Sequence, residues 1–527
     1  MRGPPVRSPR SGARPIPQDE AVGRQTTIPS PYEGWNANGN LSNMRPLQAV
    51  AMDNVFPDVT NVMLRKGSDT WISGLSDSIK SLHGWEGTGG YKLFASTNVG
   101  VYNASTSGTF GAADIACTSG DWISTNFANS GGSFLIMVNG TDSLLKYDGT
   151  SWAALTGVSV PAITGVATNT LSYVSLHKKR LWFVEEGSMS LWYLPTDSFA
   201  GAAVEFPVGA LFKLGGKLVA TGSWTLDNGS GADDYFVAIT SAGEAAVYKG
   251  TDPADATAWG LVGVYEIGRP VGRRPLSDFG GDLVYLSENG LFPLSKFLQS
   301  TIVDRTSALS FLVQGAYLPM VSAYKDVAGW CVGVFRGGNF LYINLPYSED
   351  TYSTQFVMNL TTKAWCRFTN WNASCFLGVG GKLFYACAGV VYQAWTGTSD
   401  SGVAVQGDVI QAYNQFGMPA EKQITLVRPH LAFEGNMTIQ YSIDTDFRAY
   451  DSSSQLTYVT NGAVGIWDSG DWDQCVWSLG VAPIKPTWMT VTCDLGFLHA
   501  FRIRIISSTA SAEWAATNYL FIPGGTL

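Results

Sequence analysis

Charged side chains are scarce in this sequence. Asp, Glu, Lys and Arg together supply 14% of its 527 residues, against about 25% in typical soluble domains. Within residues 101–176 the sole basic residue is Lys146. A surface so poor in charge favours a protein that hides part of itself against partners, although an extracellular β protein with a Ser-, Thr- and Asn-rich surface would have the same composition.

The few charges that are present sum to a formal net charge of −9. A general nucleic-acid-binding protein would carry a basic face, so the composition disfavours that class. A channel through which DNA slides is still compatible with it, because an acidic or neutral wall avoids sticking to the phosphates.

Several site chemistries lack their signatures. The seven cysteines have no CxxC spacing, which excludes zinc-ribbon and redox motifs and favours buried free thiols in a protein made in a reducing cytoplasm. A GxSxG elbow, a P-loop and an HExxH motif are also missing. The histidines lie far apart without metal-ligand spacing; they are His83, His177, His430 and His499. We predict no metal and no cofactor.

One acidic stretch suggests calcium. WDSGDWD (467–473) brings Asp468, Asp471 and Asp473 together. An EF-type loop needs carboxylates at alternate positions followed by Gly, and this spacing fails. A solvated turn between two Trp-bearing strands is the better interpretation.

No apolar run approaches the length of a membrane-spanning helix, so none is predicted. The start, MRGPPVRSPRSGARPIPQDE, has arginines but no apolar core and is therefore not expected to be a secretory signal. Its Pro, Gly, Ser and Arg content predicts a flexible arm over residues 1–30. Such an arm is either a solvated end or a segment that orders against a neighbouring subunit or adaptor.

Glycine (59 residues) and aromatic residues (13%) are abundant, which suits short strands joined by tight turns. One pattern recurs: a small or basic pair, an alternating apolar strand, a short polar or Gly turn and a second apolar strand. Its copies lie at 89–104, 131–149, 178–194, 280–294 and 380–394, with weaker ones at 215–222 and 337–344. The first three copies start about 42 to 47 residues apart, which is near the blade length of a four-stranded propeller.

The sequence therefore predicts an all-β fold with an irregular β-propeller of six or seven blades over residues 76–400. Two stacked β-sandwiches with similar hairpins are the competing architecture, because degenerate repeats can mislead. Beyond a Gly/Ser-rich break at 396–407 the strands lengthen and the repeat ends, which predicts a C-terminal β-sandwich over 401–527. Residues 31–75 are expected to supply N-terminal strands that join the propeller or a platform.

Two hairpins share a turn signature. LLKYDGTSWAAL (144–155) and FVMNLTTKAWCRF (356–368) both run from apolar residues through Asp or Asn and a turn to a Trp. The Asp or Asn side chain is expected to cap the turn and the Trp to cover the sheet. Sialidase blades carry an Asp box with one residue between Asp and Gly, whereas Gly149 follows Asp148 directly here. We expect no enzyme, and a propeller glycosidase is kept as the third hypothesis.

The tightest cluster of positive charge is in EIGRPVGRRPL (266–276), which contains Arg269, Arg273 and Arg274. Its prolines forbid a helix and stiffen an extended connection. An arginine fork can bond several carbonyls and carboxylates at once, so a clamp within or between subunits is favoured. A contact with phosphate in a DNA channel is the alternative.

Three segments resemble tail nozzle (tubular tail, or hub) proteins of short-tailed bacteriophages. They are residues 31–67, with Asp53-Asn54, Pro57-Asp58 and Arg65-Lys66-Gly67; residues 247–295; and the C-terminal runs GIWDSGDWDQCVW and ASAEWAATNYLFIPGGTL. The resemblance implies a structural protein with a β-propeller and added β domains and no catalytic residues. It also implies a homohexameric ring below the portal and adaptor proteins, a lumen that conducts double-stranded DNA without sequence specificity, and docking of tail fibres. The protein would be made in the bacterial host cytoplasm and reside in the virion tail. A receptor- or glycan-binding propeller module of a phage tail is the second hypothesis.

Overall fold

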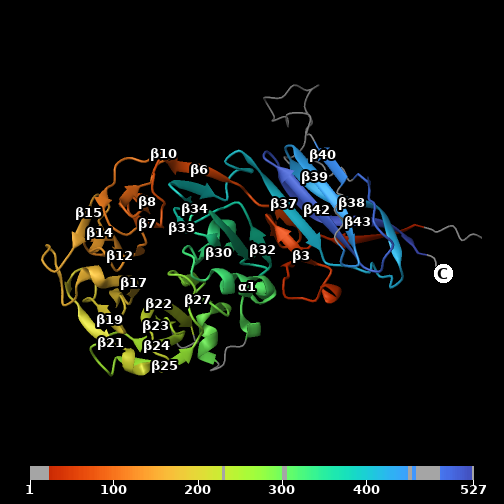
Figure 1. Ribbon diagram of the computed structural model, residues 1–527. Helices are drawn as coiled ribbons and strands as arrows, with labels where there is room; N and C mark the ends of the chain where they lie inside the picture. Colours follow the sequence, from red (N-terminus) through yellow and green to blue (C-terminus); the bar gives the residue numbers. More distant parts are fainter. Residues whose placement is uncertain (1–22, 228–231, 300–304, 449–453, 459–486, 525–527) are drawn as a thin grey trace, which may run out of the picture.

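The computed structural model describes residues 23–227, 232–299, 305–448, 454–458 and 487–524. Strands dominate these residues, and α1 (Gln314–Tyr324) is the one α-helix among them. Figure 1 shows an elongated molecule with a ring of small sheets at one end and a layered β domain at the other. The predicted all-β class is confirmed.

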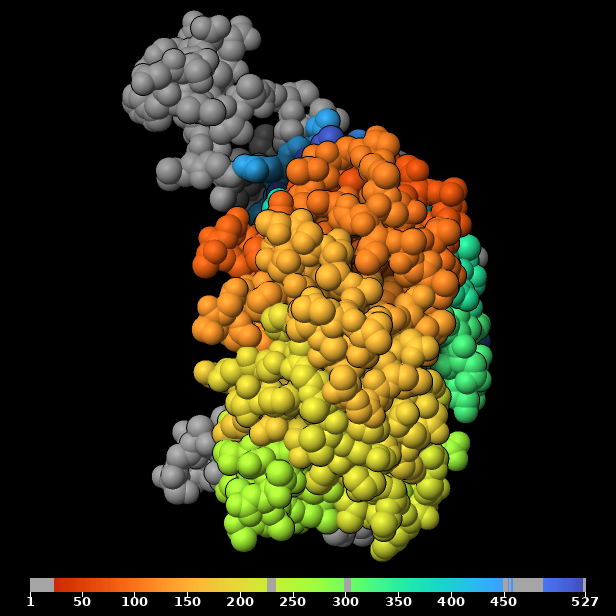
Figure 2. All heavy atoms as spheres, turned by 90° about the vertical axis from the view of Figure 1, so that its left-hand side faces the viewer, coloured from red at the N-terminus to blue at the C-terminus, as the bar shows by residue number. Residues whose placement is uncertain are grey.

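The ring consists of small antiparallel sheets, or blades, whose first strands contact one another in succession. Blades A to D each have four strands in chain order: A, β7 (Ser81–Gly87), β8 (Gly90–Ser96), β9 (Gly100–Asn103) and β11 (Ile115–Ala116); B, β12 (Ile123–Asn129), β13 (Gly132–Val138), β14 (Leu144–Tyr147) and β15 (Trp152–Leu155); C, β17 (Leu171–His177), β18 (Arg180–Glu185), β19 (Ser190–Tyr193) and β21 (Val204–Pro207); D, β22 (Leu218–Asp227), β23 (Ala232–Thr240), β24 (Glu244–Gly250) and β25 (Trp259–Glu266). Figure 2 shows these blades side by side, from orange to yellow-green.

Three further blades complete the ring. They are E, β26 (Leu276–Phe279), β27 (Asp282–Ser287) and β28 (Gly290–Pro293); F, β29 (Cys331–Phe335), β30 (Phe340–Ser348), β31 (Tyr352–Asn359) and β32 (Trp365–Phe368); and G, β33 (Cys375–Val379), β34 (Lys382–Cys387), β35 (Val390–Ala394) and β6 (Ser68–Ser73). The described residues thus form seven blades, and the prediction of an irregular β-propeller is confirmed.

Blade G is closed by a strand from the other end of the propeller segment. β6 pairs antiparallel with β35, with Ile72 opposite Val391 and Ser68 opposite Ala394. Next to this seam, β33 contacts β7 of blade A. Hydrogen bonds between β6 and β35 therefore hold the ring shut.

Blade E has three strands among the described residues, and its outer side is covered by non-strand chain. The Leu309 N–H donates to the carbonyl of Leu291 (2.9 Å), and the Leu291 N–H donates to Ser310 Oγ (3.0 Å). The hydroxyl of Tyr317 in α1 donates to the carbonyl of Ser287 (2.6 Å). These bonds satisfy an edge that would otherwise need a fourth strand.

Two sheets form the C-terminal domain, and N-terminal strands belong to both. One contains β3 (Gln48–Asp53), β37 (Val403–Gln411), β42 (His499–Ser507), β39 (Met437–Thr445) and β40 (Ser454–Tyr458). The other contains β1 (Arg24–Pro29), β4 (Val55–Pro57), β5 (Val62–Leu64), β43 (Ser511–Pro523), β38 (Lys422–Glu434) and β41 (Met489–Thr490). Buried residues alternate with half-buried or exposed ones along most of β37, and with half-buried ones along β42 from its third residue on, as in sheets with one more deeply buried face. The C-terminal domain is thus the predicted β-sandwich, with N-terminal strands woven into it.

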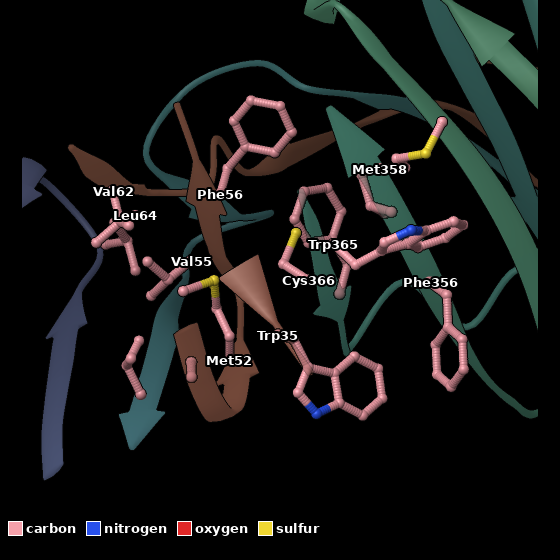
Figure 3. Packing of buried hydrophobic residues seen from close by; sticks show 14 of the residues in the cluster. Trp35, Met52, Val55, Phe56, Val62, Leu64, Phe356, Met358, Trp365 and Cys366 are labelled. Carbon is pink, nitrogen blue, oxygen red and sulfur yellow. The ribbon is translucent and has the colours of Figure 1, made fainter. Parts of the chain in front are cut away.

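One hydrophobic cluster runs from the sandwich into blade F. Figure 3 shows Met52 and Val55 of the N-terminal strands beside Trp35, with Phe356 and Trp365 of blade F on the other side. The rings of Trp35 and Phe356 meet edge to face, with centroids 4.9 Å apart. This cluster therefore forms one continuous hydrophobic core that spans the two domains.

The two signature turns have the expected geometry. Asp148 Oδ1 accepts hydrogen bonds from the backbone N–H groups of residues 150 (3.1 Å) and 151 (2.9 Å). Asn359 Oδ1 accepts from those of residues 361 (2.8 Å) and 362 (3.3 Å). Trp152 packs on Phe94, and Trp365 is fully buried. The prediction of capped turns followed by a covering Trp is confirmed.

Candidate functional site

The arginine segment connects blade D to blade E. Its backbone is fixed against β27, because the Val271 N–H donates to the carbonyl of Leu286 (3.2 Å) and the Leu286 N–H donates to that of Pro275 (2.8 Å). Gly272 has a φ of +74°, and a Cβ there would lie 2.6 Å from the Trp330 carbonyl oxygen. Only glycine fits this position, so the turn that precedes the two adjacent arginines is set by the sequence.

Arg274 reaches from the blade D–E connection to blade B. Its Nη2 donates to Asp121 Oδ1 (2.7 Å) and to the carbonyl of Trp122 (2.8 Å), immediately before β12. Its backbone forms an isolated bridge with Cys331, the first residue of β29 in blade F. One residue therefore ties together chain segments that belong to separate parts of the ring.

Arg273 makes a second tie. Its Nη2 donates to the carbonyls of Asn139 and Ser172, each at 3.0 Å, at the boundary between blades B and C. Its Nε lies 3.5 Å from Asp121 Oδ2. These are the contacts of an intramolecular clamp, with Asp121 as the shared carboxylate.

Arg269 is placed differently. It is exposed, and its guanidinium takes part in none of the hydrogen bonds or ion pairs found among the described residues. The three arginines that share one short stretch of sequence are thus divided between a clamp and the solvent.

Both clamp side chains are partly exposed, by 32% for Arg273 and 26% for Arg274. Burial lowers the pKa of Arg273, and the neighbouring Arg274 lowers it further, against the opposing effect of Asp121. Burial, the largest single effect, acts in the same direction on Arg274, but the charge of Asp121, the hydrogen bond to it and smaller effects of Cys375 and Cys331 together raise the pKa. Arginine remains protonated under either change, so two positive charges share one carboxylate here.

A cavity of about 250 Å³ lies beside the clamp. Three cationic and three anionic side chains line it: Arg273, Arg274, Lys80, Asp121, Glu349 and Asp350. Lys80 Nζ bonds Glu349 Oε1 (2.8 Å) and Asp350 Oδ2 (2.5 Å). The six formal charges cancel, so the cavity lacks the excess of positive charge that a phosphate site needs.

Buried histidines link neighbouring blades by hydrogen bonds. His83 in blade A contacts Ser81 Oγ (2.7 Å) through Nε2 and Ser124 Oγ of blade B (2.8 Å) through Nδ1. His177 in blade C contacts Ser223 Oγ of blade D (2.7 Å). Burial, with a smaller contribution from the charge of Arg274, lowers the pKa of His83 to about 3. The recurrence of the tripeptide SLH at 81–83 and 175–177 was the sequence signal for these contacts.

A second polar centre joins the propeller to the sandwich around Arg65, whose side chain is fully buried. Its Nη1 and Nη2 donate to the two carboxylate oxygens of Asp400 (3.0 and 2.6 Å). Its Nε donates to Asn54 Oδ1 (2.8 Å), and Nη2 also donates to the carbonyl of Thr369 (2.9 Å). The guanidinium lies 4.7 Å from the centroid of Trp371. Arg65 thereby connects β4, blade F and the chain that leaves blade G.

Three further ion pairs lie close to this centre, and two of them share Asp408. Asp53 in β3 accepts from Nε (2.7 Å) and Nη2 (2.6 Å) of Arg367 in β32, a bidentate bond between sandwich and propeller. Asp408 in β37 accepts from Arg502 and Arg504 in β42. Burial favours a raised pKa for Asp408, but the hydrogen bonds from the two arginines outweigh it and lower the pKa. The group around Arg65 and Asp53 is called the junction below.

The junction contains residues that the sequence analysis singled out only because they resemble those of tail nozzle proteins. Asp53-Asn54 and Arg65-Lys66-Gly67 lie within it. A Cβ on Gly67 would lie 1.8 Å from the carbonyl oxygen of Ser399, so β36 (Ser399–Asp400) can approach only a glycine. No spacing in the sequence signals this site, because its members are separated by more than 300 residues.

Metal sites and membrane-spanning helices can be assessed only for the residues that the structure describes. Within the described ranges, no group of three or more His, Cys, Asp or Glu side chains is placed to hold a metal ion. The acidic stretch 467–473 lies outside those ranges, so its calcium and turn interpretations stay open. Among the helices of the described residues, none is long and apolar enough to cross a membrane.

No protein-family model matches the chain, and no curated protein matches it. Among solved structures it is similar to BBS1N in complex with ARL6DN, at 11% identity and a TM-score of 0.37, over 64% of this chain and 99% of that chain. It is similar to Saccharomyces cerevisiae Sqt1, at 10% identity and a TM-score of 0.33, over 62% of this chain and 99% of that chain. A Bacillus subtilis glycoside hydrolase family 43 arabinoxylan arabinofuranohydrolase aligns at 10% identity and a TM-score of 0.25, over 92% of this chain and 98% of that chain. These similarities are weak, and no property of those proteins is carried over.

Proposed function

We propose that this chain is a structural virion protein of a short-tailed bacteriophage. Copies of it form a homohexameric tail nozzle ring below the portal and adaptor. The ring continues the DNA conduit, helps to retain and release the genome, and docks tail fibres. The chain is not an enzyme, and its place is the virion tail.

The observation that carries this proposal is the junction. Segments 31–67 and 510–523, two of the stretches that resemble nozzle proteins, are hydrogen-bonded to each other: β43 pairs with β5, with Glu513 opposite Met63 and Trp514 opposite Val62. Residues of the first segment also bind Asp400 and Arg367 of the propeller side. The third stretch, 247–295, carries the clamp. The resemblance therefore coincides with the residues that fix the relative positions of blades and sandwich, as expected for a subunit selected for its shape.

The clamp affects where the DNA would pass in the proposed assembly. Arg273 and Arg274 tie the blade D–E connection to blades B and C, and side chains of several blades line the cavity beside them. Because these side chains bond across blades, the proposal places the DNA outside the propeller's own axis. In the proposed assembly the lumen lies between copies, with the propellers as its surrounding wall.

Composition supports the same assembly. A charged content of 14% is low for a freely exposed surface, and interfaces between permanent partners are depleted in charge. A net charge of −9 suits a wall past which DNA slides without sticking.

The proposal is tested with the purified chain, alone and mixed with the portal and adaptor of its virion. Negative-stain imaging with mass determination should reveal a sixfold ring with an open centre in either sample. A monomer that stays unbound in the mixture would refute the nozzle function.

One observation favours the second candidate, a glycan-binding module. An open cavity of about 290 Å³ is lined by Tyr385, Tyr392, Asn370 and Asn372. The two tyrosine rings stack at 4.9 Å with an interplanar angle of 12°. Aromatic faces with amides beside them suit sugars. Glycan-array binding by the isolated chain that Tyr392→Ala abolishes would support this function over the first.

A further inference from the structure

Three loops meet at the end of the sandwich farthest from the propeller, close to the mark C in Figure 1. We call residues 413–421, 446–448 and 494–498 the sandwich tip. It exposes three large apolar side chains: Phe447 (45% exposed), Leu495 (52%) and Phe497 (47%). Single exposed apolar residues are ordinary, but three on adjoining loops call for an explanation.

The tip is held rigid from beneath. Lys422 is fully buried, and its Nζ donates to three carbonyl oxygens: those of Met418 (3.0 Å), Ala420 (3.1 Å) and Phe497 (2.6 Å). One ammonium group therefore joins the first loop to the third. Burying a lysine is costly unless all of its donors are satisfied, so this arrangement gives up solvation to fix the loops.

The middle loop is fixed by a carboxylate. Asp446 Oδ1 accepts from the backbone N–H groups of Phe497 (3.1 Å) and Leu498 (2.9 Å). The ring of Phe447 packs on Tyr413, with centroids 4.8 Å apart. Exposed apolar groups on preorganised loops lose little conformational entropy when a partner covers them, which is a property of binding surfaces.

The N-terminal arm joins the described part of the chain beside the sandwich tip. Arg24, the first residue of β1, pairs with Phe521 near the end of β43. Its Nη1 lies 4.0 Å from Met418 Sδ in the first tip loop. Residues 1–22, which precede it, contain five prolines and four arginines within the first 17 residues. A segment of 22 residues spans at most about 75 Å, so its whole length can reach the tip of its own or of an adjacent copy.

The chemistry of arm and tip is complementary. Proline-rich segments dock on exposed aromatic rings, because little entropy is lost in fixing them. Guanidiniums stack on such rings and bond carboxylates. Besides Asp446, the tip offers the exposed carboxylates of Glu421 and Asp494. Against these three carboxylates stand two exposed guanidiniums, that of Arg448 and that of the neighbouring Arg24, while the ammonium of Lys422 is turned inward to carbonyls.

We propose that the sandwich tip is the docking site of the N-terminal arm, residues 1–22, through its prolines and arginines. The arm comes from the same copy or from a neighbouring one. Docking covers Phe447, Leu495 and Phe497, and it makes the arm an ordered part of the protein surface.

Limited trypsin digestion of the full-length chain tests the proposal. Cleavage after Arg7 and Arg10 should be slow in the wild type and about tenfold faster in Phe447→Ser/Phe497→Ser, because the variant loses both rings. Val403→Ser, which removes an apolar side chain exposed elsewhere on the sandwich, should leave the rate unchanged. Equal rates in the wild type and the double variant would overturn the proposal.

A synthetic peptide of residues 1–22 gives an independent test with a chain that begins at Gly23. Saturable binding that Phe497→Ser weakens about tenfold supports docking, whereas no saturable binding overturns it. A control peptide with its four arginines replaced by Gln should bind more weakly. The source of the arm follows from trypsin protection at several dilutions of the full-length chain: protection independent of concentration indicates the same copy, and protection lost on dilution indicates a neighbour.

Discussion

Removing the buried guanidinium of the junction should destabilise the protein strongly. In Arg65→Met the carboxylate of Asp400, 11% exposed, keeps its bonds from Ser68 Oγ (3.1 Å) and Trp371 Nε1 (3.1 Å) but loses both arginine bonds. Breaking a buried ion pair on one side costs about 3–5 kcal/mol, since the remaining charge is left uncompensated. Asn54 Oδ1 also loses its arginine donor. We therefore expect a loss at the upper end of that range.

The double variant Arg65→Met/Asp400→Asn separates the charge from the packing. An amide at position 400 still accepts from Ser68 and Trp371 and carries no charge, so part of the stability should return. We expect a coupling of about 2 kcal/mol or more between the two positions. Urea unfolding followed by tryptophan fluorescence measures it, because Trp371 lies 4.7 Å from the guanidinium. Subtilisin cleavage within residues 396–402 should report loosening of the junction in the single variant.

A matched control is Arg45→Met, which breaks a surface pair with Glu33 at 3.7 Å. Exposed pairs of this kind contribute about 0–1 kcal/mol. Single effects at positions 65 and 400 that add to within about 0.5 kcal/mol would refute the reasoning. So would an Arg65→Met protein as stable as Arg45→Met.

Three further outcomes are expected. Burial lowers the pKa of His83 to about 3 in the folded state from an ordinary 6.5, so protonation below pH 6.5 favours the unfolded chain. His83 alone should lower the stability by about 2 kcal/mol as the pH drops from 7 to 5, and His177 and His499, whose pKa values are lowered to about 4, should add to the fall. Urea unfolding of His83→Asn should therefore show a smaller fall than the wild type over the same range. Arg274→Gln, which loses the bond to blade B, should lower the thermal midpoint and impair assembly, whereas the exposed Arg269→Gln should do neither; normal particles with altered genome ejection from Arg274→Gln would indicate a DNA contact instead. Gly67→Ala should cost about 3 kcal/mol or more by overlap with β36, measured by thermal unfolding against Gly89→Ala, whose Cβ would meet nothing within 4 Å.

Local pattern predicted much of the propeller. The recurring hairpin copies at 89–104, 131–149, 178–194, 280–294 and 380–394 fall on the second and third strands of blades A, B, C, E and G. These strands alternate apolar residues around a short turn, so neighbouring residues alone define them. The same local rule located the capped turns at Asp148 and Asn359.

Local pattern could not predict which strands far apart in the sequence pair with each other. β3 joins β32 and β37, and β43 joins β1 and β5, across hundreds of residues. Periodicity says which face of a strand is buried, and it does not say which strand lies beside it. For the same reason the sequence did not indicate the carboxylate that the clamp binds, because Asp121 is 153 positions from Arg274. Glu266 and Asp278 are near Arg274 in sequence, but they form no ion pair with it among those found in the described residues.

The seam between β6 and β35 also determines when, during synthesis of the chain, the propeller ring can close. Ser68 pairs with Ala394, so the ring cannot shut until more than 300 further residues have left the ribosome. At synthesis rates of about 5–20 residues per second, that interval is roughly 15 to 65 s. Throughout it, β1, β3 and β6 wait without their distant partners β43, β37 and β35, as edges that can join the wrong chain. A nascent copy is thus most vulnerable at its oldest end, and slowed translation or a C-terminal truncation should lead to aggregates and not to a smaller folded domain.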